Sequence, residues 1–532
     1  MKKYYQNIKI AALVFVGGLM FNGCTKLDEK VHSELLASNF QATAKDVPSL
    51  IAPVYTNLRG MVASWQGYFD VQEESADAIV TPARPNGWVD GGTYQRMHQH
   101  VWTPTQGQPN GLYSNCFRGI NNANRVIFQI ESGEIPVPSG KDAIIAELKT
   151  ARAYYYSILL DNHGNVPIVT DFKDTSLPKQ STRQQVYDFV VKEISDNVPL
   201  LTETADKVTY GRFTKWAGKA VLARVYLNAQ VYTGTAQWDK CIATCDDIIN
   251  QANTKGTYAL AAKYKENFSS INETCKEIIF SVPYDEVFAT ESNIHMKTLD
   301  PLMQLVFPMQ VQPWGGNCAV PQFIDTYDSD DQRLKDSWIQ GPQYNATTGA
   351  MVINYVKTVK SLFGSASNEG YRIGKYEIKT GMRGGSSVDF PLYRYADVLM
   401  MKAESLLRTG KATEAAVIVT EVRQRNFTAN PAKAAVTAAQ LQQGSAYNYG
   451  EWQNGSVVNA QGGVDITYGR MLDELGWEFA AEAKRRQDII RFGVFTRKKW
   501  FAHLNSDNNK IIFPIPQNSL LTNVNLKQNP GY

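Results

Sequence analysis

The stretch that decides the fold is Pro391–Phe427, PLYRYADVLMMKAESLLRTGKATEAAVIVTEVRQRNF. Its apolar and small residues recur at alternating steps of four and three, the spacing of one face of an α-helix. They are Leu392, Ala396, Leu399, Ala403 and Leu406. Gly410 suits the left-handed residue that ends a helix, and a second helical pattern follows it. Two helices joined by so short a turn lie antiparallel, so the stretch predicts one unit of a stack of helical hairpins.

Similar helical patterns occur earlier in the chain, and they place the hairpins at about residues 112–252 and 391–427. Thr214 is expected to cap one of these helices, and Ser181 is expected to cap the helix Arg183–Leu201. Residues 258–389 are rich in Gly, Asn, Pro and aromatic residues, with a strand expected at Glu277–Val282. The predicted fold class is therefore mainly α. Tetratricopeptide-like helical hairpins form a scaffold, and a large loop-rich insertion contains short strands.

Charged residues accompany the helical patterns. Those of the central hairpin allow two interpretations, a catalytic acid and base group or ion pairs between packed helices. The second is favoured because an unpaired buried charge is costly; the residues are Asp397, Glu404, Arg423 and Arg425. The C-terminal part, 470–532, is expected to be a helix and a tail, with Glu482 and Arg486 forming a pair four residues apart.

Several motifs carry a family resemblance. The hairpin contains Arg394-Tyr395-Ala396-Asp397-Val398 and Val422-Arg423-x-Arg425, and the chain ends with Phe513-Pro514-Ile515-Pro516 and Gln528-Asn529-Pro530-Gly531-Tyr532. With the charged residues of 478–491, these motifs resemble those of SusD/RagB-type proteins, which are outer-membrane glycan-binding lipoproteins of Bacteroidetes-type bacteria. The resemblance covers most of the chain and is thinnest in Gly67–Trp102 and Tyr258–Asn317. It implies a single SusD-like domain over residues 47–532.

The N-terminus has the features of a lipoprotein signal. Lys2-Lys3 precedes the apolar run Ile10–Met20, which is too short to span a bilayer. Gly23-Cys24 then resembles a bacterial lipobox, so residues 1–23 are a predicted signal peptide and Cys24 is the predicted lipidation site. Residues 24–46 are the expected lipidated tether, and the only predicted contact with the membrane is through the lipids.

Composition excludes several functions. The net charge of +3 comes from 54 basic and 51 acidic residues, which gives no reason to expect nucleic acid as a partner. Five cysteines remain besides Cys24, an odd number that does not form a disulfide framework. No phosphate-binding loop, nucleophile elbow or HExxH motif occurs, and neither a cofactor nor a metal is expected. His98-x-His100 lacks a third ligand.

A hydrolase remains the less favoured alternative, because Glu73, Glu74 and Asp77 contain the carboxylates that a glycosidase pair requires. A binding site for sugar needs instead a flat aromatic platform with fixed hydrogen-bonding groups. Trp88 and Trp314 each occur in a loop rich in Gly, Pro and Asn, where little local core is available. The predicted ligand-binding residues are Trp88, Tyr94, Trp314, Asn86, Asp90, Arg96, Gln312 and Asn317.

Two functions from different classes follow. The resemblance implies a cell-surface lipoprotein of the outer membrane that captures oligosaccharide or polysaccharide and delivers it to a TonB-dependent, SusC-like transporter. It is expected not to be an enzyme. The alternative is a peptide-capturing lipoprotein or interaction scaffold of the same fold, because helical repeats generally present peptide grooves.

Overall fold

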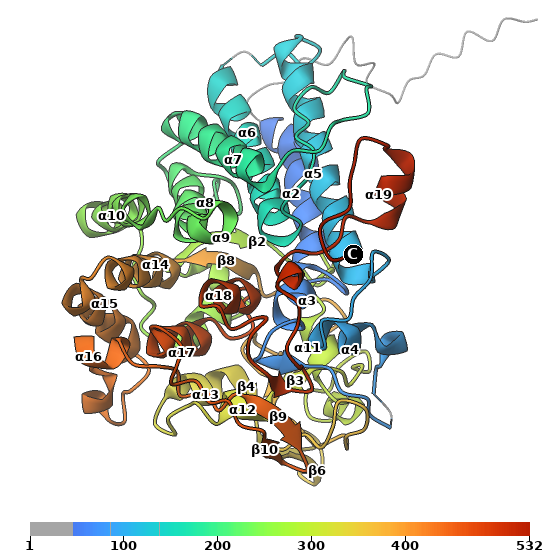
Figure 1. Ribbon diagram of the computed structural model, residues 1–532, viewed down its shortest axis with the longest axis vertical. Helices are drawn as coiled ribbons and strands as arrows, with labels where there is room; N and C mark the ends of the chain where they lie inside the picture. The colour runs from blue at the N-terminus through green and yellow to red at the C-terminus, as the bar shows by residue number, and fades with distance from the viewer. Residues whose placement is uncertain (1–45, 86, 138) are drawn as a thin grey trace, which may run out of the picture.

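The computed structural model describes residues 46–85, 87–137 and 139–532 (Figure 1). The predicted signal peptide, Cys24 and all of the predicted tether except Asp46 lie outside the described residues. Within the described part of the chain, no helix has the length and apolar character needed to cross a membrane.

Helical hairpins form the scaffold, as predicted. Each helix of the stack packs on the next: α5 on α6, α6 on α7, α7 on α8, α8 on α10, α10 on α14 and α14 on α15. The stack is continuous in space although the insertion separates α10 from α14 in the chain (Figure 1). The bounds are α2 Val47–Val62, α5 Gly107–Glu131, α6 Lys141–Asn162, α7 Arg183–Asn197, α8 Lys215–Leu227, α9 Ala229–Thr233, α10 Trp238–Lys255, α14 Tyr395–Arg408 and α15 Ala412–Gln424.

The ends of these helices show where local sequence controls the fold. Thr214 caps α8 by accepting a hydrogen bond from the Ala217 amide, as predicted, and Gly410 has a φ of +83° between α14 and α15. The cap of α7 is Thr182, not Ser181. Thr182 and Gln185 form a reciprocal capping box, which satisfies two backbone amides at the start of the helix.

The start of the central hairpin differs from the prediction. Phe390–Arg394 is strand β8, which pairs antiparallel with β2, Ile278–Val282, and α14 begins only at Tyr395. Leu392 therefore lies on a strand and not on the helix face. All five residues of β8 are buried, and a short buried strand cannot be distinguished from a buried helical segment by apolar spacing alone.

Short strands occur in the insertion, as expected, but also beyond it. The insertion contains β2, β3 Cys318–Ala319, β4 Trp338–Ile339, β5 Gly341–Tyr344, β6 Met351–Tyr355 and β7 Arg372–Ile373. β1, Ile79–Val80, pairs with β3. A three-stranded sheet that the sequence analysis did not predict joins β9 Gly450–Gln453, β10 Ser456–Val458 and β11 Trp500–Phe501. The other helices are α3 Tyr68–Glu73, α4 Thr93–His98, α11 Ile294–Thr298, α12 Pro321–Ile324, α13 Gln332–Ser337, α16 Ala438–Leu441, α17 Gly469–Phe479, α18 Arg485–Arg491 and α19 Gln517–Thr522.

The predicted C-terminal helix is two helices. The chain breaks between α17 and α18, where Ala481 and Ala483 have φ values of +59° and +58°. The predicted pair of Glu482 with Arg486 is therefore wrong. Glu482 instead accepts hydrogen bonds from Arg394 (2.7 Å) and Lys375 (2.6 Å), both fully buried. These long-range ion pairs hold the carboxylate in the break between the helices.

Ion pairing, the favoured interpretation, accounts for the charged residues of the central hairpin. Each finds at least one opposite charge on another element, so none remains as an unpaired buried charge. The pairs are Asp397 with Arg224 and Lys484 at 2.6 Å, Glu404 with Arg491 at 2.7 Å, Arg423 with Glu474 at 2.7 Å, and Arg425 with Glu478 at 2.6 Å. These charges are paired with one another inside the scaffold and are unavailable for acid–base catalysis.

Candidate functional site

The two loops that contain Trp88 and Trp314, both predicted to bind a ligand, lie next to each other. The Trp88 amide donates a hydrogen bond of 2.9 Å to the Trp314 carbonyl, and the two ring centroids are 5.4 Å apart with a tilt of 56°. Both rings are partly exposed. Residues 226 positions apart in the chain thus form one aromatic surface, here called the tryptophan pair.

The second loop is braced from behind by α11 and the residue after it. The backbone amides of Trp314, Gly315 and Gly316 each donate a bond of 2.8 Å to a carbonyl of Met296, Leu299 or Lys297. A Cβ atom on Gly316 would lie 2.8 Å from the Trp88 ring and 2.7 Å from the Lys297 carbonyl. Only glycine therefore allows Trp88 to lie so close against this loop.

The first loop reaches α4 through residues that favour a tight turn. Asp90, Gly91 and Gly92 have φ values of +50°, +60° and +73°. The Asp90 carboxylate accepts a hydrogen bond of 3.1 Å from the Gln66 side chain, and Arg96 donates one of 2.9 Å to the Gly91 carbonyl. Asp90 and Arg96 thereby hold the turn, and Arg96 remains exposed beside it.

Tyr94 and Asn317 lie behind the tryptophan pair, not on the surface. Both side chains are fully buried, and the Tyr94 ring centroid is 4.7 Å from that of Trp88. The Tyr94 hydroxyl donates to Asp70 at 3.0 Å, and the Asn317 amide donates to Glu74 at 3.1 Å. Direct ligand contact by these two residues does not fit their burial, so we assign them a supporting position.

Two predicted ligand-binding residues remain, Gln312 and Asn86. Gln312 is exposed near Trp314, with no hydrogen bond from its side chain to the described residues. Asn86 lies outside the described residues. The surface residues that can contact a ligand are therefore Trp88, Trp314, Asp90, Arg96 and Gln312.

A buried ion pair supports the site, and the sequence analysis did not find it. Lys297 donates to Asp70 at 2.6 Å, and neither side chain is exposed. Its backbone carbonyl also accepts bonds from Gly316 and Asn317. A lysine and an aspartate 227 residues apart offer no local pattern that would pair them.

The carboxylates considered for hydrolysis are inaccessible. Glu73, Glu74 and Asp77 have no exposed surface. Burial raises the pKa of Glu73 to about 7 and that of Glu74 to about 8. Asp77 accepts two bonds from Arg485, at 2.6 and 2.9 Å. A sugar on the surface cannot contact these groups, so the glycosidase interpretation does not fit this geometry.

The two histidines of the His98-x-His100 motif lie in the interior of the described domain. His98 and His100 are buried, and burial lowers the pKa of His98 to about 3. His100 lies 2.8 Å from the Ser75 carbonyl through Nε2. Among the described residues, no group of three or more His, Cys, Asp or Glu side chains is arranged to hold a metal ion.

Comparisons with known proteins place this fold in a family. The profile described as "SusD family" matches residues 233–505, and a second, described as "Starch-binding associating with outer membrane", matches residues 27–227. The starch-binding protein SusD of Bacteroides thetaiotaomicron is 23% identical over 84% of this chain and 82% of its own.

Solved structures agree with the profiles. NanU of B. fragilis has a TM-score of 0.72 at 19% identity, covering 94% of this chain and 99% of its own. Surface glycan-binding protein A of B. thetaiotaomicron, in complex with laminarihexaose, has a TM-score of 0.68 at 17% identity, covering 92% and 100%. The first profile spans more than half of the residues, and the chain therefore belongs to the SusD family.

Proposed function

We propose that the protein is a cell-surface lipoprotein of the outer membrane that binds a neutral oligosaccharide or polysaccharide on the tryptophan pair. The observation that carries the proposal is the pairing of two partly exposed indole rings on loops that backbone hydrogen bonds hold in place. An aromatic face stacks on the CH-rich face of a sugar, and Asp90, Arg96 and Gln312, which are near the two tryptophans in the sequence and at least partly exposed, are the expected partners of its hydroxyls.

Similarity to known binding proteins supports the proposal. One relative of this chain is named for binding starch, and one similar solved structure holds laminarihexaose. Binding to such a platform requires no perturbed pKa and no cofactor. We infer that the role is capture, not cleavage.

Delivery to a TonB-dependent, SusC-like transporter completes the proposal, with Cys24 carrying the lipid anchor. If the protein docks on such a transporter, solubilisation of the native outer membrane in mild detergent recovers both proteins together. Recovery of this chain alone, under conditions that keep other membrane complexes intact, contradicts the transporter partnership.

The test of the ligand class compares glycans with peptides. The domain from residue 46 onward is run in native gels containing starch, laminarin, xylan, mannan or pectic galactan, and is titrated with pooled peptides. We expect retardation by at least one polysaccharide and no binding of peptide. Saturable peptide binding without glycan binding would instead favour the peptide-capturing alternative.

A further inference from the structure

A concavity lies beside the segment that contains Trp88, apart from the surface formed by the tryptophan pair. It is open on one side, has a volume of about 340 Å³ and has two walls, the turn at residues 360–363 and the end of β9 with the turn that follows it, with Phe501 contributing from β11. This volume falls within the range of about 300–1,000 Å³ typical of ligand sites. We call it the hairpin pocket, defined by Lys360, Phe363, Trp452, Gln453, Asn454 and Phe501.

One wall presents an exposed phenylalanine on a fixed turn. Phe363 is 65% exposed, while Leu362 beside it is buried and anchors the turn. The Phe363 amide donates to the Ser361 hydroxyl at 3.1 Å, and the Ser365 hydroxyl donates to the Ser361 carbonyl at 2.8 Å. These bonds fix the turn that carries the ring before any ligand arrives, which lowers the entropic cost of binding.

The opposite wall is equally fixed. Asn454 and Gly455 have φ values of +50° and +83°, which allow the two-residue turn joining β9 to β10. Trp452 is partly exposed, and its indole N–H donates a bond of 2.6 Å to the Val359 carbonyl. The pocket thus has an aromatic ring on each wall.

Polar groups around these rings are free to bind a ligand. The side chains of Gln453, Asn454 and Lys360 are exposed and make no hydrogen bond or ion pair with any described residue. The Glu369 carboxylate accepts a bond from the Lys360 backbone amide at 2.8 Å, which helps to fix the backbone of this turn. Aromatic faces beside free amide and ammonium groups that can bond hydroxyls are features that suit a sugar.

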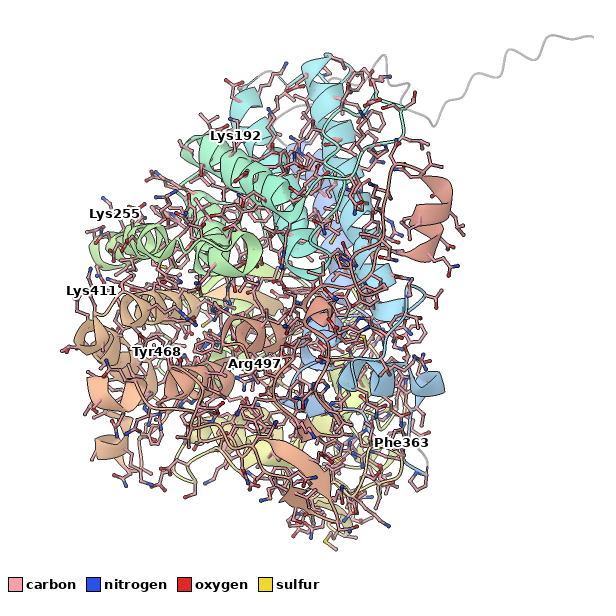
Figure 2. All side chains as sticks on the ribbon, viewed as in Figure 1. Lys192, Lys255, Phe363, Lys411, Tyr468 and Arg497 are labelled. Carbon is pink, nitrogen blue, oxygen red and sulfur yellow. The ribbon has the colours of Figure 1, made fainter. Side chains whose placement is uncertain are left out.

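Hydrogen bonds connect this pocket to the tryptophan pair. The Leu362 carbonyl accepts from the Ala83 amide at 2.9 Å and from the Gln95 side chain at 3.0 Å. The Ser365 amide donates to the Ala83 carbonyl at 2.9 Å. These partners belong to the segment that also contains Trp88. Figure 2 shows Phe363 at the lower right edge of the molecule, below the position of α4 in Figure 1.

We propose that the hairpin pocket is a second carbohydrate subsite, which binds a further part of the glycan chain held by the tryptophan pair. The inference rests on the proposed function and extends it, because a ligand that spans both sites must be a longer chain. The protein then prefers long glycans over short fragments of the same linkage.

The test uses whichever polysaccharide of the panel retards the wild type, with its hexasaccharide and disaccharide as titrants in calorimetry. Phe363→Ala removes the exposed ring, and Phe288→Ala is the matched control, since Phe288 is 89% exposed on another loop. We expect Phe363→Ala to weaken hexasaccharide binding by about fivefold to a hundredfold, the range for loss of one stacking contact. Disaccharide binding and the thermal midpoint stay unchanged.

We expect Trp88→Ala to weaken binding of both the hexasaccharide and the disaccharide. This variant therefore tests the tryptophan site separately from the second subsite. If Trp88→Ala weakens binding while Phe363→Ala behaves like Phe288→Ala with the hexasaccharide, the second subsite is wrong and the tryptophan site stands. If no glycan of the panel binds the wild type, the proposed function fails and the subsite fails with it. Gln453→Ala, with an effect in the same direction but smaller, provides an independent check on the pocket.

Discussion

The Lys297 ammonium lies 2.6 Å from the Asp70 carboxylate, with both side chains fully buried behind the tryptophan pair. Asp70 also accepts the hydroxyl of Tyr94, against which Trp88 packs. The pair therefore joins α3 to α11, and through α11 to the loop of Trp314. Through these contacts, the buried ion pair positions the tryptophan pair.

Removal of one partner tests this role. Lys297→Met leaves Asp70 buried without its counter-ion, and such a loss typically costs about 3–5 kcal/mol of unfolding free energy. Urea denaturation measures the change. Lys192→Met is the control, since Lys192 pairs with Asp196 on the surface with 76% of its side chain exposed (Figure 2). Equal, small shifts in the two variants would contradict a structural role for the buried pair.

Stability is expected to depend on pH through Glu74. Burial, assisted by the neighbouring Asp70 charge, raises its folded-state pKa from 4.5 to about 8, so folding favours the protonated carboxyl. This contribution is complete below about pH 4.5 and is lost as the pH rises through about 8. Glu74→Gln, which stays neutral, should flatten the decline of the thermal midpoint between pH 5 and 8. A decline as steep as in the wild type would show that other groups cause it.

Close helix packing in the central hairpin gives a third prediction. Ala403 is fully buried in α14, so Ala403→Trp should cost about 1–3 kcal/mol or more of unfolding free energy through overpacking. Val417→Trp on the neighbouring α15 is the control, because Val417 is 65% exposed. Chemical denaturation of both variants provides the comparison. If Ala403→Trp is no less stable than the control, the two helices do not pack closely there.

Lipid attachment is predicted at Cys24. Cells expressing the full chain and fed radiolabelled palmitate should label the wild type, while Cys24→Ala should carry no label. Cys116→Ala is a suitable control because Cys116 is buried in the folded domain. Label that persists on Cys24→Ala would place the lipid on another residue and contradict this prediction.

Sequence patterns were sufficient for the helical scaffold, because apolar spacing, Gly410 and Thr214 are local signals. Sequence patterns did not predict the elements whose conformation depends on tertiary contacts. β8 is a strand because β2 pairs with it, and the break at Ala481–Ala483 persists because Glu482 is held by Arg394 and Lys375.

In the candidate site, too, local signals could be read from the sequence and tertiary contacts could not. Trp88 and Trp314 could be proposed from the sequence because a tryptophan in a polar, glycine-rich loop has little local core to join. Their contact, and the burial of Tyr94 and Asn317, depend on the way the insertion folds back onto the N-terminal loop. No local spacing encodes that arrangement.

The most direct test measures glycan affinity in Trp88→Ala and Trp314→Ala by calorimetry, alongside thermal unfolding, with Trp88→Phe as the conservative variant. Each alanine variant should lose about 1–3 kcal/mol of binding free energy, the scale of aromatic stacking on flat ligands, and Trp88→Phe should lose less. The thermal midpoint should change little, since both rings are partly exposed. Unchanged affinity in both alanine variants would contradict the account and turn attention to Trp65, which is 49% exposed. A large fall in the midpoint would instead make Trp88 part of the core.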